Sequence, residues 1–127
     1  MKKINTENKQ MNVNITTHPE SDVLLIFIHG LTGNYLQMYH FQNYFKDKCN
    51  TLSYDLSGRG DSTMQNNPTD IHQHSKDLIE IIDSLEHDNI VLAGYSMGGY
   101  IAVDVAGQTS KVKKVVLSSL PREGRTR

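Results

Sequence analysis

The sequence GYSMGG at residues 94–99 restricts the fold of this chain more than any other segment. An apolar run at 89–95 leads into it, and apolar side chains at helical spacing follow it at 97–108. A strand that turns directly into a helix forces the positions two before and two after the turn together, so both must be small. Gly94 and Gly98 stand there. The segment therefore predicts a sharp, strained strand-to-helix turn that exposes the Ser96 hydroxyl at the carboxyl end of a sheet.

The remaining apolar runs predict the sheet that this turn belongs to. Residues 11–17 alternate apolar and polar side chains, as in a half-buried strand, and we expect them at a sheet edge. Residues 23–28 are continuously apolar, which is typical of a strand buried on both faces. Further strands are predicted at 51–56, 89–95 and 112–117.

Helical spacing of apolar side chains fills the gaps between these strands. The predicted helices cover residues 36–46, 68–85 and 97–108, and the first places Met38, Phe41 and Phe45 on one face. Pro68 suits the first turn of the second helix, with Asn67 as its cap. After one or two antiparallel edge strands, strands and helices alternate to the end of the chain. This order predicts an α/β fold, a doubly wound and mostly parallel sheet with helices on both faces.

Composition excludes several classes of protein. The chain has 127 residues, one domain's worth, with 13 basic against 14 acidic residues, so neither nucleic acid nor an anionic membrane is an expected partner. The single cysteine, Cys49, excludes an intrachain disulfide and fits a cytoplasmic location. No run is long and apolar enough for a transmembrane helix, and the first residues lack the apolar region of a signal peptide.

The residues around Ser96 suggest nucleophilic chemistry. The helix that begins at Met97 turns its free N–H groups toward the serine, where an oxyanion would form, and Gly99 lets this helix pack closely on the strands. A second glycine-rich segment, HGLTG at 29–33, follows the most apolar strand at the same edge of the sheet. We predict an oxyanion hole formed by the backbone N–H groups of Leu31 and Met97. His29 and Gly30 are interpreted as supporting residues that fix this loop.

A third segment, DLSGRGDS at 55–62, follows the next strand. It is interpreted as a structural turn in which Asp55 and Ser62 hydrogen-bond to backbone amides, and a phosphate-binding loop is the alternative. The chain contains no phosphate-loop pattern of the GxxxxGK[ST] type.

Together the three segments resemble the α/β-hydrolase superfamily, in its esterase/lipase-like branch, and the resemblance covers nearly all of residues 11–120. It implies a serine hydrolase that cleaves a carboxylic ester or related small acyl substrate through an acyl-enzyme on Ser96, with no metal and no cofactor. Tyr95, next to the nucleophile, is a candidate substrate contact. The bond cleaved stays open among ester, thioester, amide, lactone and carbon–carbon bonds.

The sequence departs from the family in its acid and base. The family's catalytic residues run serine, acid, histidine along the chain, but all six histidines precede Ser96. The carboxylates that follow are Asp104, inside the next predicted helix, and Glu123, near the C-terminus. We therefore expect an N-terminal half, in which residues 1–120 form a partial hydrolase domain. Residues 121–127 are interpreted as an arginine-rich tail left by truncation, a frameshift or cloning, and an ordinary basic C-terminus is the alternative.

Three interpretations of such a chain stay open. It is a hydrolase domain with little activity alone, one half of a split hydrolase completed by a partner chain, or a non-catalytic small-molecule binding module. The strand at 112–117 would form an open apolar edge, and helix faces meant to cover further strands would be exposed. We therefore expect marginal stability or self-association through the sheet edge.

Overall fold

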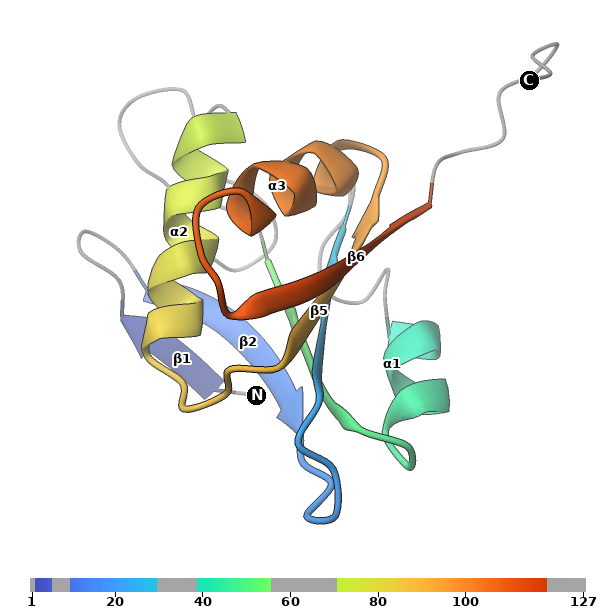
Figure 1. Ribbon diagram of the computed structural model, residues 1–127. Coiled ribbons are helices and arrows are strands. Elements are labelled where there is room, and N and C mark those ends of the chain that lie inside the picture. The colour runs from blue at the N-terminus through green and yellow to red at the C-terminus, as the bar shows by residue number, and fades with distance from the viewer. Residues whose placement is uncertain (1, 6–9, 30–38, 56–70, 119–127) are drawn as a thin grey trace, which may run out of the picture.

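The computed structural model describes residues 2–5, 10–29, 39–55 and 71–118 (Figure 1). Within these residues six strands form one sheet in the order β1-β2-β4-β3-β5-β6. The strands are β1 (Lys2–Asn5), β2 (Gln10–Thr16), β3 (Leu24–Ile28), β4 (Asn50–Tyr54), β5 (Ile90–Tyr95) and β6 (Val112–Ser118). The helices are α1 (Tyr39–Phe45), α2 (Ile71–Asp83) and α3 (Met97–Ala106).

The topology confirms the predicted fold class. Strands β4, β3, β5 and β6 are parallel, whereas β1 and β2 pair antiparallel at one side of the sheet. The expected edge position of residues 11–17 is wrong, because β1 lies outside β2 and makes β2 the second strand. Met11, Asn12 and Val13 are consequently all buried, so the half-buried alternation predicted there does not hold.

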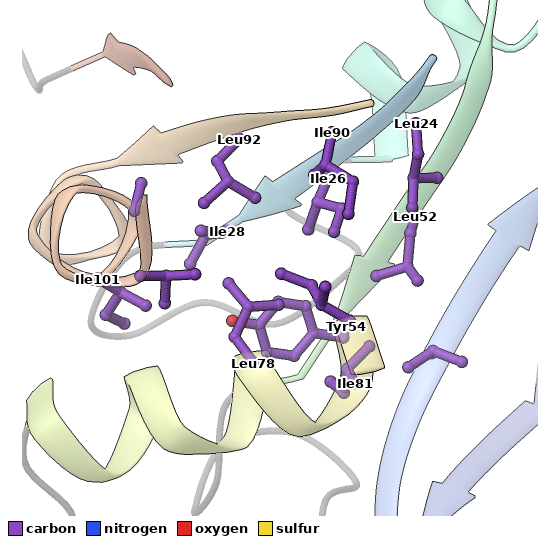
Figure 2. Close-up of a cluster of buried hydrophobic side chains, with 14 of the residues drawn as sticks. Leu24, Ile26, Ile28, Leu52, Tyr54, Leu78, Ile81, Ile90, Leu92 and Ile101 are labelled. Carbon is purple, nitrogen blue, oxygen red and sulfur yellow. The ribbon is translucent and has the colours of Figure 1, made fainter. Parts of the chain in front are cut away.

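The hydrophobic core lies between the sheet and the two longer helices. Alternate side chains of β3, β4 and β5 point toward α2 and α3, as Figure 2 shows, and are less than 2% exposed. Each fully buried Leu or Ile contributes about 1.5–3 kcal/mol relative to an exposed one. The core side chains labelled in the figure are Leu24, Ile26, Ile28, Leu52, Tyr54, Leu78, Ile81, Ile90, Leu92 and Ile101.

The opposite face of the sheet carries α1, which lies apart from α2 and α3 in Figure 1. Its one buried side chain is polar: the Gln42 amide nitrogen donates to the Asn14 carbonyl and to Thr51 Oγ1, each at 2.9 Å. The Ser53 hydroxyl donates to Gln42 Oε1 at 2.8 Å. The apolar face predicted for this helix is not buried here, because Phe41 is 56% exposed and Phe45 is half-buried. Met38 lies outside the described residues.

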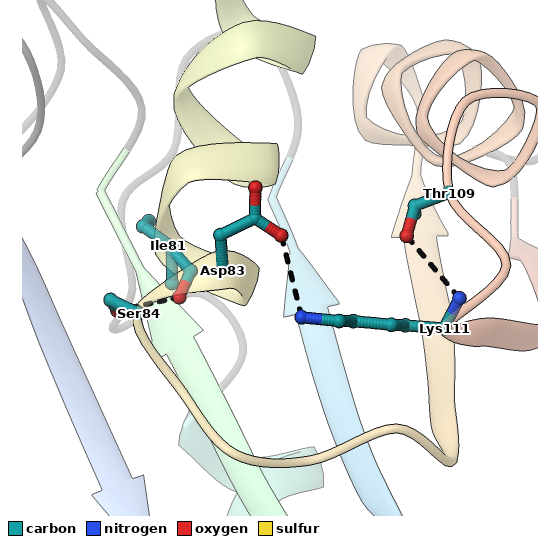
Figure 3. Close-up of polar contacts among 5 residues, drawn as sticks. All are labelled: Ile81, Asp83, Ser84, Thr109 and Lys111. Atoms are coloured by element: carbon teal, nitrogen blue, oxygen red, sulfur yellow. Dashed lines mark hydrogen bonds and ion pairs between the residues drawn. The ribbon is translucent and has the colours of Figure 1, made fainter.

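Polar contacts lie at the end of α2 and at the start of β6 (Figure 3). The Ser84 hydroxyl closes the end of α2 by donating to the Ile81 carbonyl at 2.6 Å. Lys111 Nζ lies 3.4 Å from Asp83 Oδ1, and the Lys111 N–H donates to Thr109 Oγ1 at 3.2 Å. Because the ion pair is exposed to solvent, it contributes less than about 1 kcal/mol, and the position of β6 depends mainly on its pairing with β5.

None of the helices in the described ranges has both the length and the apolar character needed to cross a lipid bilayer.

Candidate functional site

Ser96 lies between the last residue of β5 and the first residue of α3. Its backbone angles are φ 58° and ψ −121°, and it is the one residue other than glycine with positive φ in the described part of the chain. An L-residue held in such a conformation costs about 1–3 kcal/mol, which the surrounding structure must offset. Ser96 is held in this conformation by β5, which pairs with strands on both sides, and by α3. The strain at Ser96 therefore persists as long as the sheet and α3 are folded.

Two glycines make this turn possible by close backbone contact. A Cβ on Gly98 would lie 2.3 Å from the Ile28 carbonyl oxygen and 2.8 Å from that of His29. A Cβ on Gly94 would lie 2.3 Å from the Gly98 oxygen. Gly99 differs, since a Cβ there would meet the Leu117 side chain at 3.4 Å, an ordinary contact. Only hydrogen fits at the first two positions, which lie two residues before and two after the serine.

The start of α3 gives the site its electrostatic character. Ser96 occupies the N-cap position, but its side chain makes no capping hydrogen bond, and the residue is half-buried. The Gly99 N–H donates to the Ser96 carbonyl at 2.9 Å, which closes the first turn. Met97 begins the helix, so its amide lies at the positive end of the helix dipole. This arrangement favours negative charge next to the serine.

His29 follows β3 and is completely buried. Its carbonyl oxygen lies against Gly98, so the end of β3 and the start of α3 are in close contact. The predicted loop residues Gly30 and Leu31 lie outside the described residues, and the oxyanion role of Leu31 stays a prediction.

Asp55 and Asn12 form a buried pair that the sequence did not reveal. The Asn12 side-chain amide donates to Asp55 Oδ2 at 3.3 Å, while the Asp55 N–H donates to the Asn12 carbonyl at 3.1 Å. These bonds join β2 to the residue after β4, 43 positions along the chain. A bracing role for Asp55 fits this geometry, and Ser62 lies outside the described residues. Asn12 carries no local motif that could have singled it out.

Tyr95 lines an apolar groove of about 220 Å³ on the α1 face of the sheet. Tyr39 and Tyr100, at the starts of α1 and α3, are 47% and 70% exposed. Neither lines this groove. The groove residues are Leu25, Phe27, Phe41, Phe45, Ala93, Gly94, Tyr95 and Val116.

The acid and base expected of a serine hydrolase are not assembled within the described residues. No hydrogen bond joins the Ser96 hydroxyl to a described histidine. Asp104 lies in α3 two turns beyond the serine. The same residues contain no group of three or more His, Cys, Asp or Glu side chains that could hold a metal ion.

A mostly parallel sheet with a strained serine between strand and helix is typical of an α/β-type hydrolase scaffold. Residues 23–124 match the model of the alpha/beta hydrolase fold family, and the chain belongs to this family.

Several similar proteins carry esterase or lipase in their names. The chain is 30% identical over 105 residues to a Haemophilus influenzae protein named "Putative esterase/lipase". It is 29% identical to a lipase-esterase related protein from Clostridium acetobutylicum, whose structure superposes on 84% of this chain with a TM-score of 0.72. The structure of Est816, described as an N-acyl homoserine lactone degrading enzyme, superposes on 93% of the chain with a TM-score of 0.83 at 22% identity, which supports the fold.

The chain spans only part of these proteins. The match covers 80% of this chain but 36% of the Haemophilus influenzae protein. It covers 45% of each of the two solved structures.

Proposed function

We propose that Ser96 is the nucleophile of a serine hydrolase that acts on carboxylic esters or related acyl substrates. The observation that carries this proposal is the strained conformation of Ser96 at the start of α3. Strain at a polar residue persists when the structure around it specifies that conformation, and such residues cluster at active sites. The similarity to esterase/lipase proteins supports an ester as the substrate class.

In the proposed reaction the Ser96 oxygen attacks the acyl carbon, and the alcohol leaves with a proton. The developing oxyanion is stabilised by the N–H of Met97, with the N–H of Leu31 as second donor. His29 and the glycines at 30, 94, 98 and 99 support these groups without touching the reacting atoms. Water then cleaves the acyl-enzyme and regenerates the serine.

We further propose that the acid and the histidine come from a polypeptide segment outside these 127 residues. A serine hydroxyl is a weak nucleophile without a base. The longer chains of the relatives leave room for such a segment. The isolated chain is then at most weakly active, since enzymes lacking the triad keep about 10³–10⁴ over water from binding and the oxyanion hole.

A fluorophosphonate probe tests the role of Ser96. The purified chain is incubated with the probe, with and without added imidazole as an external base, and adducts are located by mass spectrometry. We expect slow labelling confined to Ser96, accelerated by imidazole and absent in Ser96→Ala. Ser84, whose hydroxyl bonds to the Ile81 carbonyl, is an internal control that should stay unlabelled.

Two other outcomes would change the proposal. Rapid labelling without imidazole means that a histidine of this chain, or of a second chain, already supplies the base. No adduct on the folded chain with imidazole present refutes the nucleophile assignment and favours a binding module without catalysis.

A further inference from the structure

The two open edges of the sheet differ in chemistry. Within the described residues, β1 and β6 each pair with a neighbouring strand on one side only. β1 exposes Lys3, and lysine on an edge strand opposes the addition of another strand. The lysines of β6, at 113 and 114, lie in its amino half, whereas its carboxyl half exposes Val116 and Leu117 by 49% and 60%. The carboxyl half of β6 is therefore the edge that favours a further strand.

The same half of β6 borders the apolar groove on the α1 face. Val116 lies opposite Ala93 of β5, and both line the groove together with Phe41 of α1. The groove also reaches the two residues that precede Ser96. Helices α2 and α3 cover the other face of the sheet (Figures 1 and 2), and parallel strands normally have both faces buried. Within the described residues, an uncovered edge and an uncovered apolar face thus meet beside the candidate nucleophile.

The position of β6 in the sheet decides what a polypeptide bound there can reach. Neighbouring strands lie about 5 Å apart. A strand added to β6 lies two spacings from β5, which is about 10 Å from the strand that ends just before Ser96. A strand added to β1 lies five spacings, or roughly 24 Å, from β5. Side chains that another polypeptide brings to Ser96 therefore come by way of β6 and not of β1.

We propose that the polypeptide segment that supplies the acid and the histidine binds along the carboxyl half of β6 and fills the adjoining groove with apolar side chains. The identity of this segment rests on the proposed function. The similar proteins contain enough chain for it, because the matches cover 36% of the Haemophilus influenzae protein and 45% of the Clostridium acetobutylicum protein. Strand pairing and apolar contact need no covalent link, so the segment binds as a separate chain too.

Co-expression with a separate completing chain tests the proposal. The probe is the part of the Clostridium acetobutylicum protein that follows its region of similarity, because the family's acid and histidine follow the serine along the chain. We expect this part to copurify with the 127-residue chain through an affinity tag on the latter. In the complex, hydrogen exchange should slow in β6 and α1, whereas β1, at the other edge, should exchange as it does in the isolated chain.

Matched substitutions locate the contact. Phe41→Lys and Val116→Lys place a charge in the groove, at positions that are 56% and 49% exposed. Val103→Lys is the control, because Val103 is 54% exposed on α3, over the other face. We expect the dissociation constant of the complex to rise at least about tenfold with each of the first two and less than about threefold with the control. Far-UV circular dichroism checks that each variant keeps its fold.

Three results would overturn this docking site: no complex on co-expression, slowed exchange in β1 in place of β6, or equal weakening by Val103→Lys. Fluorophosphonate labelling separates these results from a failure of the proposed function. A complex with the expected exchange pattern in which Ser96 stays unlabelled refutes the nucleophile and supports the docking site. Imidazole-driven labelling of Ser96 in a chain that forms no complex supports the nucleophile and refutes the docking site.

Discussion

Replacing Gly98 by alanine tests how much folding stability depends on the close backbone contacts at the strand-to-helix turn. The new Cβ would lie 2.3 Å from the Ile28 oxygen and 2.8 Å from the His29 oxygen. Real Cβ atoms essentially never come that close, and both oxygens are backbone atoms at the end of a central strand. The strand or the helix must therefore move. Overpacking of a buried site costs about 1–3 kcal/mol, and rigid backbone on one side places this case at the upper end.

Gly99→Ala is the matched control, because it adds the same methyl group one residue later in the same turn of α3. There the nearest atom is the flexible Leu117 side chain at 3.4 Å. The gain in helix propensity, at most about 1 kcal/mol, is shared by both variants and cancels in their comparison. We expect Gly98→Ala to unfold with about 2–3 kcal/mol less free energy than Gly99→Ala.

Urea denaturation followed by far-UV circular dichroism measures this difference. Slopes of about 1–3 kcal/mol per molar urea convert it into a midpoint shift of roughly 1–2 M. Equal midpoints for the two alanine variants would refute the argument, since they would mean that the turn relaxes without cost. The same experiment on Gly94→Ala should give a loss of similar size, because its Cβ would lie 2.3 Å from the Gly98 oxygen.

Three further substitutions probe the site and its supports. Ser96→Gly should be about 1 kcal/mol more stable to urea than Ser96→Ala, because glycine adopts φ 58° without a Cβ penalty. Gln42→Met should lower the free energy of unfolding by about 2–4 kcal/mol, because the buried hydroxyls of Ser53 and Thr51 each lose a hydrogen-bond partner. The control is Asn43→Ala, an exposed position on the same helix, which should change this free energy by less than about 0.5 kcal/mol. Burial, and secondarily the charge of Asp77, raises the pKa of Tyr54 far above its usual value. The unfolded chain therefore ionises this hydroxyl first, and stability falls above about pH 10 by up to about 1.4 kcal/mol per pH unit, a loss that Tyr54→Phe should remove.

Each of these expectations has a contrary result. A Ser96→Gly variant no more stable than Ser96→Ala would mean that the positive φ carries little strain. Loss of stability by Asn43→Ala equal to that by Gln42→Met would show that α1 is held by general packing and not by its buried amide. Parallel alkaline stability curves for the wild-type chain and Tyr54→Phe would show that the hydroxyl reaches water in the folded state.

Local sequence patterns determine the part of the fold around Ser96. The small residues at 94 and 98, the apolar run before them and the helical spacing after them specify a strand-to-helix turn within residues 89–108. The alternation of strands and helices likewise predicted a mostly parallel sheet, which the pairing of β4, β3, β5 and β6 confirms. Such features depend on neighbours in the chain, so they can be read without a structure.

Only the tertiary structure decided which face of each helix became buried. Helical spacing placed Phe41 and Phe45 on one side of α1, yet the side chain that became buried is Gln42. Its partners Asn14 and Ser53 lie 28 and 11 positions away on different strands, and no local pattern links them. Periodicity reports which side chains share a face. Which face is buried depends on contacts between distant segments, and these exist only once the sheet has formed.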